Sequence, residues 1–390
     1  MRTFEFYSPT KIIFGPDKEK EVGRILKSYH ASRVLVVTGM NSVIKSGLLG
    51  KVITALESEH ISYLVLKGVR ANPSFDLVKE GVRLHKENKF DFILAIGGGS
   101  VIDTAKCIAV NANHDGDVKN FNLHLEEPTS ALPIGVILTI SAAGSELSNS
   151  CVIQDDETKI KSGFNSDLVR PVFAIENPEI TFSVSKEQTA YGIVDILMHT
   201  LERYFSPSEE NELADEFALG LLKIVLDTGL KAFDNPNNYD YRATLMLASS
   251  LSHNGLTSVG KKYYMPVHQL EHSLSGTFVN IAHGCGLAVL FPAWCKYYYK
   301  YDIDKFATLG ERVFDIYSGD KTTDALSTIA AFEEYFMRLG MPKTLSELGV
   351  KEEDIEDLVN KITKCGTKTV YHHTKPINDE VARKIYYSCL

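Results

Sequence analysis

The chain has 390 residues, of which 44% are hydrophobic and 23% are charged, and its formal net charge is −9 at pH 7. This length allows two domains with cores of their own, and the composition is that of an ordinary soluble globular protein. The negative charge argues against a surface built to attract nucleic acid or an anionic membrane, because both are polyanions.

The cysteines and the apolar runs predict a cytoplasmic protein. The six cysteines are scattered and form no Cys-x-x-Cys pair, so we expect reduced thiols and no disulfide framework. The N-terminal stretch MRTFEFYSPTKIIFG alternates and turns too early to be a signal peptide. The longest apolar run, at residues 131–140, contains Pro133 and Gly135 and is too short to span a bilayer.

Strands and helices alternate over the first half of the chain. Residues 4–6 and 11–14 flank a Ser-Pro-Thr turn and predict a short hairpin or two edge strands. Ser74 is a plausible N-cap for a helix that follows it. Continuous apolar runs predict buried strands at residues 33–38, 61–68, 90–96 and 132–140. With helices between them, these strands predict a doubly wound, mainly parallel, Rossmann-like sheet.

The pattern changes near Pro178. The last strand-like runs are residues 151–154 and 172–175. From Ser185 onward the sequence has long helical periods, for example at residues 211–233, 241–256, 284–299, 322–339 and 351–363. We therefore expect an α/β domain over residues 1–184 and an all-α helical-bundle domain over residues 185–390.

A glycine turn follows the third predicted strand of the α/β domain. Gly97, Gly98, Gly99 and Ser100 lie between that strand and a helix, which is the geometry of a phosphate cradle at a helix N-terminus. The common Gly-x-Gly-x-x-Gly fingerprint is absent, and a tight structural turn with nothing bound remains the alternative. The hydroxyl-rich residues 139–146 follow the next strand and could add donors along the same edge.

A candidate metal site lies in the helical domain. Asp195 and His199 are four residues apart in a helical stretch, so both side chains leave one face. Alone, such a pair is more often a surface hydrogen bond or an ion pair. A second cluster follows with His268, His272 and His283 among apolar neighbours, where an imidazole without a partner would be costly. A carboxylate with several imidazoles is a ligand set for a divalent metal.

Four segments together resemble one enzyme family over essentially the whole chain. They are GGGSVIDTAK at 97–106, LTISAAGSELS at 138–148, NPEITFSVSKEQTAYGIVDILMHTLERYF at 177–205 and HQLEHSLSGTFVNIAHGCGLAVLFPAW at 268–294. The chain resembles the iron-containing (group III) alcohol dehydrogenases, most closely their butanol-dehydrogenase-like, NADP(H)-dependent branch. The resemblance implies the family's dehydroquinate-synthase-like architecture, a dinucleotide-binding first domain, and a second domain that binds metal and substrate.

The resemblance implies a metal held by Asp195, His199, His268 and His283. The interval from His268 to His283 is one residue longer than the usual pattern, which questions the connecting loop more than the ligands. His272 falls where the family keeps a non-ligand histidine, so it is a candidate catalytic proton relay, with a packing residue as the alternative. Fe(II) is the implied metal and Zn(II) its common substitute.

The resemblance also assigns the dinucleotide site. Gly98, Gly99 and Ser100 would cradle the pyrophosphate, Asp103 would lie near the nicotinamide, Thr139 and Ser141 would line the dinucleotide, and Lys161 would reach a ribose hydroxyl. After the first strand of the sheet, NAD-dependent members tend to place an aspartate that holds the ribose 2′-hydroxyl. This chain has Gly39, Asn41 and Ser42 there with Lys45 nearby, which would admit a 2′-phosphate. NADP(H) is therefore favoured, and NAD(H) stays possible.

The implied reaction is hydride transfer between NADP(H) and a small aliphatic alcohol or aldehyde, of the butanol and butyraldehyde type. A metal at the cluster would act as a Lewis acid. Apolar residues near the ligands are expected to form the substrate wall: Leu256, Val259, Phe278 and Trp294. The resemblance also implies a homodimer, in which the N-terminal strands could pair across a two-fold axis, because an exposed edge is a template for another strand.

Three alternatives remain open. A glycerol-dehydrogenase-like polyol dehydrogenase shares the fold but generally holds zinc through one aspartate and two histidines. A non-catalytic sensor would keep dinucleotide and metal without turnover. A metallohydrolase that needs no dinucleotide would make the glycine turn purely structural.

Overall fold

The computed structural model describes residues 1–206, 211–372 and 374–390. They form two compact units, one of Tyr7–Val184 and one of Met1–Phe6 with Ser185–Leu390. The first six residues, which we expected in the α/β domain, therefore group with the helical unit. The main-chain N–H of Arg2 donates to the oxygen of Gly260 at 3.1 Å, which ties this terminus to the helical unit.

The α/β unit contains a six-stranded sheet in the order β1-β8-β5-β4-β2-β3. All five pairings are parallel, as predicted for a doubly wound sheet. The direction in which strands are added reverses at β2 and β4, which pair side by side. The strands are β1 (Lys11–Phe14), β2 (Arg33–Gly39), β3 (Ser62–Val69), β4 (Phe92–Gly97), β5 (Ile134–Leu138) and β8 (Phe173–Glu176).

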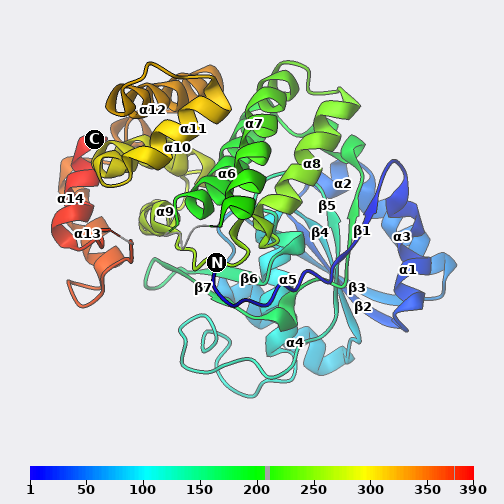
Figure 1. Ribbon diagram of the computed structural model, residues 1–390. Helices are drawn as coiled ribbons and strands as arrows, with labels where there is room; N and C mark the ends of the chain where they lie inside the picture. The colour runs from blue at the N-terminus through cyan, green and yellow to red at the C-terminus, as the bar shows by residue number, and fades with distance from the viewer. Residues whose placement is uncertain (207–210, 373) are drawn as a thin grey trace. The chain divides into compact units, whose positions relative to one another are not determined.

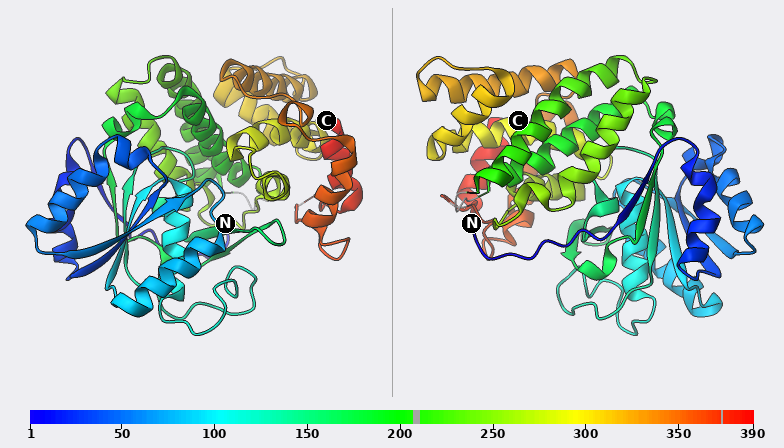
Figure 2. Two further views of the ribbon diagram at one scale, coloured as in Figure 1. Left: turned by 180° about the vertical axis from the view of Figure 1, so that it is seen from behind. Right: turned by 45° about the vertical axis from the view of Figure 1, so that its right-hand side comes forward.

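Helices cover both faces of this sheet, which explains its continuous apolar runs (Figures 1 and 2). Every residue of β4 is buried, as expected for a strand covered on both sides. One face packs against α1 (Val22–Ser28) and α3 (Leu48–Ser58). The other face lies under α5 (Gly99–Asn111), with α4 (Phe75–Asn88) beside it. Ser74 is the N-cap residue of α4, although its side chain makes no capping bond. The short α2 (Ser42–Lys45) follows β2.

The prediction for the N-terminus was right for one strand and wrong for the other, and one strand pair was incomplete. Residues 11–14 form the edge strand β1, which pairs in parallel with β8, but residues 4–6 form no strand and no hairpin is present there. β6 (Ser150–Asp155) was expected, but its antiparallel partner β7 (Ile160–Asn165) was not. β7 contains Lys161, Ser162 and Gly163, and this polar composition hid the strand signal.

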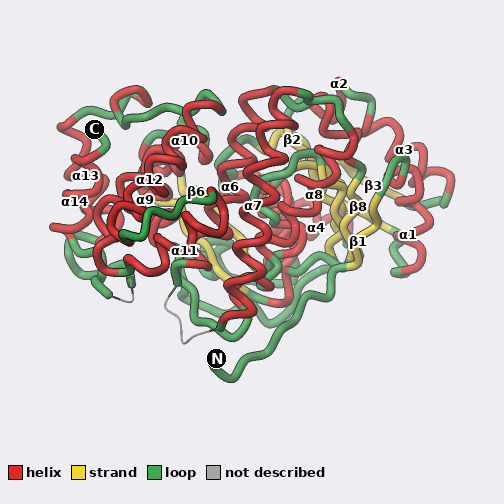
Figure 3. Tube along the Cα trace, turned by 45° about the horizontal axis from the view of Figure 1, so that its top comes forward, coloured by secondary structure: helices red, strands yellow, loops and turns green. Residues whose placement is uncertain are grey.

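The second unit is helical, and every named strand lies in the other unit (Figure 3). α9, α11 and α14 had not been predicted individually. None of the described helices combines the length and the apolar sequence that crossing a lipid bilayer requires. The helices are α6 (Lys186–Tyr204), α7 (Glu212–Asp234), α8 (Tyr239–His253), α9 (Pro266–Thr277), α10 (His283–Tyr298), α11 (Ile303–Phe314), α12 (Lys321–Arg338), α13 (Ile355–Thr363) and α14 (Asp379–Ser388).

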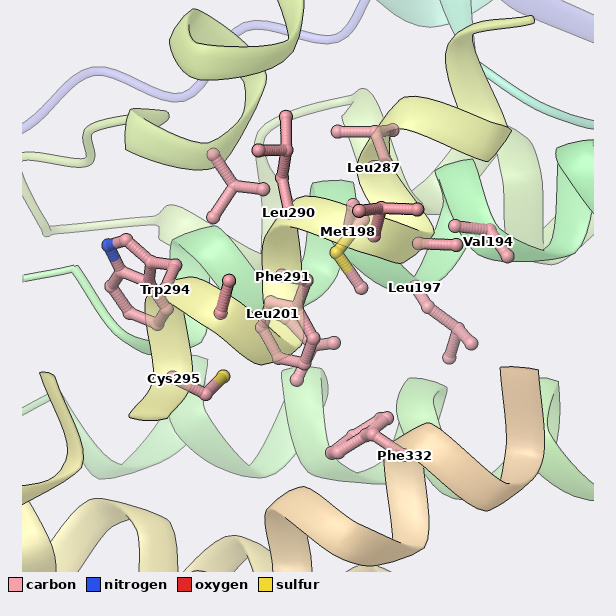
Figure 4. Close-up of a cluster of buried hydrophobic side chains, with 14 of the residues drawn as sticks. Val194, Leu197, Met198, Leu201, Leu287, Leu290, Phe291, Trp294, Cys295 and Phe332 are labelled. Atoms are coloured by element: carbon pink, nitrogen blue, oxygen red, sulfur yellow. The ribbon is translucent and has the colours of Figure 1, made fainter. Parts of the chain in front are cut away.

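The core of the helical unit is built around α6 and α10. Figure 4 shows Leu197 and Leu201 of α6 packed near Phe291 of α10 and Phe332 of α12. Gly284 allows the close approach, because a Cβ there would lie 2.6 Å from the Tyr191 Cα. Trp294, which we expected in a substrate wall, is a core residue: it is 1% exposed and stacks on Tyr298 with ring centroids 5.1 Å apart.

Candidate functional site

The first two predicted ligands lie one turn apart on α6. Asp195 and His199 are each 5% exposed, although both carry polar side chains. Ser185 begins this helix as its N-cap, and its hydroxyl accepts the N–H of Gln188 at 3.1 Å. The Asp195 Oδ1 and the His199 Nε2 are 3.8 Å apart, as the four-residue spacing on one helix face leads one to expect.

Two further histidines complete the cluster from other helices. The Nε2 atoms of His268, on α9, and His283, the first residue of α10, lie 3.6 and 3.8 Å from the same Asp195 Oδ1. Three imidazole nitrogens therefore surround one carboxylate oxygen. Ligand atoms about 2.1 Å from a tetrahedral metal are about 3.4 Å apart, so this spacing suits a divalent cation. Residues 278–282 connect α9 to α10 within the interval from His268 to His283.

The ligand atoms at the centre of the cluster lack the hydrogen bonds that buried polar atoms normally make. The Asp195 Oδ1, the His199 Nε2 and the His268 Nε2 are buried and have no hydrogen-bond partner among the described residues. Burying such groups without compensation costs on the order of 1–3 kcal/mol each. A divalent metal would satisfy all of them at once, so the residues present fit a metal centre.

Electrostatics differ among the ligands. Burial, together with His253 and His268, holds the pKa of His199 well below its ordinary value, so this imidazole is neutral. Burial also disfavours the charged form of His268, but Glu202 and Asp195 outweigh it and raise the pKa of His268 to about 9. A metal held at this site would have to displace a proton from His268.

Two carboxylates behind the ligands were missed from the sequence. Glu202 contacts the Nδ1 of His268, and Glu271 contacts the Nδ1 of His283. Both glutamates are almost fully buried. The sequence does contain a pattern that could have found them, His-x-x-Glu. Glu202 follows His199 by three residues, and Glu271 follows His268 by three residues.

Two other histidines lie against the cluster. The half-buried ring of His272, on α9, has its centroid 5.8 Å from His283 and 6.4 Å from His268. His253, at the end of α8, was not predicted, and its ring meets His199 edge-on with centroids 4.1 Å apart. Among the described residues, neither belongs to the group of ligand atoms formed by Asp195, His199 and His268, but His272 forms a second such group with Glu271 and His283.

The glycine turn lies at the carboxyl end of β4, as predicted. Gly98 is the N-cap residue of α5, and Gly99 is its first residue. Added Cβ atoms at Gly97 and Gly98 would lie 2.4 Å from Val101 and Ile140 side-chain atoms, so packing alone requires both glycines. At Gly99 the nearest atom would be the Ala143 Cβ at 3.2 Å. Ser100 follows in the first turn and is half-buried.

A buried lysine joins α5 to the hydroxyl-rich segment at residues 139–150. The Nζ of Lys106 donates to the main-chain oxygens of Ser145, Ser148 and Ser150 at 2.8, 2.9 and 2.8 Å. It also donates to the hydroxyls of Ser145 and Ser148. Burial lowers the pKa of Lys106 to about 8, although Asp103 opposes this shift. Thr139 and Ser141 are half-buried in the same segment.

Asp103 is fixed on the same helix. Its carboxylate accepts the Ser145 hydroxyl at 2.8 Å and the Val152 N–H at 3.1 Å. Burial raises the pKa of Asp103, against the lowering effects of Lys106, these hydrogen bonds and Lys161. Lys161, on β7, is thus close enough to act electrostatically on Asp103.

The loop after β2 lies beside the glycine turn, because Thr38 and Ile96 are paired across β2 and β4. Gly39 ends β2, Asn41 is the N-cap residue of α2, and Ser42 begins that helix. Asn41 and Ser42 are exposed. This is the switch point of the sheet, where ligands of doubly wound folds bind.

Comparison with known proteins covers both units. Residues 9–178 match the family described as iron-containing alcohol dehydrogenase, and residues 189–388 match the C-terminal part of the Fe-containing alcohol dehydrogenase family. The chain is 38% identical over 99% of both chains to NADH-dependent butanol dehydrogenase A of Clostridium acetobutylicum. It is 34% identical, over the same share of each, to the NADPH-dependent aldehyde reductase YqhD of Escherichia coli. The crystal structure of NADH-dependent butanol dehydrogenase A from Thermotoga maritima superposes with a TM-score of 0.96 at 33% identity, covering 100% of this chain and 99% of that one. The chain therefore belongs to the iron-containing alcohol dehydrogenase family.

Proposed function

We propose that this protein transfers a hydride between NADP(H) and a small aliphatic alcohol or aldehyde at a metal held by its helical unit. The observation that carries the proposal is the set of three Nε2 atoms around the Asp195 Oδ1, with buried polar atoms that lack partners among the described residues. Family membership implies a nicotinamide dinucleotide and an iron-type metal. The names of the butanol dehydrogenase and aldehyde reductase relatives support the substrate class.

In this proposal Asp195, His199, His268 and His283 hold the metal, which is Fe(II) with Zn(II) as its substitute. A metal so bound supplies Lewis-acid chemistry, which stabilises negative charge on the substrate oxygen. The four ligands contribute one carboxylate and three imidazoles, and Glu202 and Glu271 behind two of these imidazoles add further negative charge close to the metal. Burial of His199 and His268 keeps bulk water away from these charges.

His272 is the proposed proton relay. It is half-buried, and its ring lies beside two ligand histidines, where an alcohol proton would have to leave. An imidazole can exchange a proton near neutral pH, which the buried, neutral His199 cannot do. The alternative, a packing role, would change stability and leave the pH dependence of turnover unaltered.

The dinucleotide is proposed to bind along the carboxyl edge of the sheet. The N–H groups at the start of α5, from Gly99 and Ser100, would receive the pyrophosphate, with Gly98 allowing close approach. Thr139 and Ser141 supply hydroxyls along the same edge. Asp103 is proposed on the nicotinamide side and Lys161 at a ribose hydroxyl.

The preference for NADP(H) rests on the loop after β2. Gly39, Asn41 and Ser42 carry no negative charge, so these residues do not repel a 2′-phosphate, and Asn41 and Ser42 offer donors. The relatives differ on this point, since their names give NADH for the clostridial enzyme and NADPH for the Escherichia coli enzyme. Cofactor choice must therefore be read from this chain's own loop.

A homodimer in the cytoplasm completes the proposal. Phe4, Phe6 and Tyr7 are 46–49% exposed and come shortly before the edge strand β1 in the chain, so they offer apolar surface that a second copy could cover. All six cysteines are free thiols, as in proteins of a reducing compartment.

The first test is metal-dependent aldehyde reduction. The protein is purified without oxygen, stripped with a chelator, and assayed with butyraldehyde and NADPH after addition of Fe(II) or Zn(II), with NADH in parallel. We expect NADPH oxidation that depends on added metal. A higher kcat/KM with NADH would overturn the cofactor preference, and no turnover across a panel of aldehydes and alcohols would overturn the proposed reaction.

A further inference from the structure

Two buried glutamates stand behind the proposed metal ligands, one for His268 and one for His283. We infer that Glu202 and Glu271 are positioning residues that fix the tautomer and orientation of these two histidines and thereby set the affinity of the centre for metal. The inference rests on the proposed metal site, and it concerns residues that the ligand pattern itself does not include.

Glu202 is anchored before it meets the histidine. Its Oε1 accepts the main-chain N–H of Val267 at 2.5 Å, and its Oε2 lies 3.3 Å from the N–H of His268. These N–H groups belong to the first turn of α9, where a carboxylate is favoured by the helix dipole. The same Oε2 contacts the His268 Nδ1. Glu202 is thus held in one orientation by the backbone that also carries its histidine.

Glu271 occupies space that a glycine leaves open. It projects from α9 toward the first turn of α10 and contacts the Nδ1 of His283 there. Gly286 lies three residues beyond His283, and a Cβ on it would be 2.8 Å from the Glu271 Cγ. The motif His283-Gly-Cys-Gly286 therefore has two packing functions, since Gly284 admits Tyr191 of α6 and Gly286 admits Glu271.

The chemical consequence concerns the tautomer. An ionised carboxylate accepts only, so each Nδ1 next to it must carry the proton and donate. The lone pair of each neutral ring then lies on Nε2, the atom that faces the Asp195 Oδ1 at 3.6 Å for His268 and at 3.8 Å for His283. Carboxylate–histidine pairs of this kind also make the ligand nitrogen more basic.

The three ligand histidines are not supported alike. Glu202 and Glu271 contact the Nδ1 atoms of His268 and His283, whereas no carboxylate among the described residues contacts the Nδ1 of His199. Its ring is held by other rings, stacked on His268 at 4.4 Å and edge-on to His253 at 4.1 Å. The two carboxylates also link successive helices, because Glu202 of α6 holds a ligand on α9 and Glu271 of α9 holds a ligand on α10. A test must therefore separate ligand positioning from helix packing.

The test measures Co(II) binding by the full-length protein, with and without the carboxylates. Glu202→Gln and Glu271→Gln keep side-chain volume and remove the charge. In Glu202→Gln the new amide would also have to direct its NH₂ group at either the Val267 N–H or the histidine. Affinity is measured by competition with a chromophoric chelator, ligand geometry by the visible Co(II) spectrum, and folding of the metal-free protein by circular dichroism.

We expect each variant to bind Co(II) about 10- to 100-fold more weakly than wild type, with an altered visible spectrum and unchanged helix content. Glu19→Gln is the matched control, because Glu19 is also fully buried but pairs with Lys51 and Asn177 in the other unit. If Glu271→Gln does not fold, Gly286→Ala replaces it. That change should weaken Co(II) binding by displacing Glu271, whereas Gly220→Ala on α7, where a Cβ meets nothing within 4 Å, should not.

The outcomes separate the two proposals. Wild-type affinity and spectrum in Glu202→Gln and Glu271→Gln would overturn the positioning role while leaving the metal site intact. Failure of the wild-type protein to bind Co(II) would overturn the metal site, and the positioning role with it.

Discussion

Neighbouring side chains account for the residues of the glycine turn, but they do not account for the residues of the histidine cluster. At Gly97 and Gly98 the neighbouring Val101 and Ile140 side chains leave no room for a Cβ, so the turn is accounted for without any ligand. Around Asp195 the reverse holds, because buried donors and acceptors face one another at 3.6–3.8 Å without hydrogen bonds. A glycine that packing already requires gives no evidence for a ligand. Buried polar atoms without hydrogen bonds do give such evidence, because buried polar atoms are normally paired.

The largest loss of activity is expected from a substitution in the histidine cluster. Asp195→Ala should abolish metal retention and lower aldehyde reduction by about 10³-fold or more, since a Lewis acid contributes several kcal/mol to such a step. Metal content and NADPH oxidation measure the two effects. Asp324→Asn is the control, because Asp324 is equally buried in the same unit but accepts the Ser318 N–H at 2.8 Å. Full metal and turnover in Asp195→Ala would remove the contrast between the two regions.

A smaller loss is expected from a residue beside the cluster. His272→Ala should lower kcat by about 10²-fold, the lower range for a lost general acid or base, and leave the metal content unchanged. The pH profile of kcat in the wild-type and variant proteins is the measurement. If the variant loses stability and keeps the wild-type pH profile, His272 is a packing residue.

A pair of substitutions can distinguish a packing role of the glycine turn from a role in binding the dinucleotide. Gly98→Ala should destabilise the α/β unit by about 1–3 kcal/mol, because its Cβ would lie 2.4 Å from the Ile140 Cγ2. Adding Ile140→Ala should recover much of that loss in thermal unfolding. NADPH affinity, measured by fluorescence, then decides the matter. Affinity that stays weak in the stable double variant supports the phosphate cradle, and full recovery means that the turn serves packing alone.

The smallest effect concerns cofactor choice. Gly39→Asp should shift the ratio of kcat/KM values about tenfold from NADPH toward NADH, since a carboxylate repels the 2′-phosphate and accepts ribose hydroxyls. The site can accept a side chain, because the nearest atom to a Cβ would be the Val69 oxygen at 3.6 Å. Gly50→Asp adds the same charge at an exposed glycine with nothing within 4 Å. Equal ratios in both variants would show that the loop after β2 does not select the cofactor.

The sequence predicted those features that depend on local pattern. The parallel sheet followed from continuous apolar runs such as residues 33–38, and the Asp195–His199 face followed from helix periodicity. Helical periodicity recurs from Ser185 onward, and it predicted that the second unit is helical. The four predicted ligands lie together, although their roles remain predictions until metal binding is measured.

The prediction failed or was incomplete where contacts between residues far apart in the sequence determine the structure. Residues 4–6 look like a strand, but the N–H of Arg2 just before them donates to the oxygen of Gly260, far along the chain, and they pair with none of the described strands. β7 exists because β6 pairs with it, not because of its own composition. Trp294 was expected in a substrate wall as one of the apolar residues near the ligands, and the fold buries it in the core. Glu202 and Glu271 could be seen as spacing, but only the fold shows which histidine each one faces.

The five hydrogen bonds of Lys106 have a kinetic consequence for the proposed dinucleotide site. They hold residues 145–150 against α5, so the donors of that segment and the start of the helix form one preformed surface. Ordering a free loop costs about 1–2 kcal/mol per residue, and here that ordering is complete before any ligand arrives. A dinucleotide should therefore associate in a single bimolecular step, whose observed rate rises linearly with concentration and shows no plateau from loop closure.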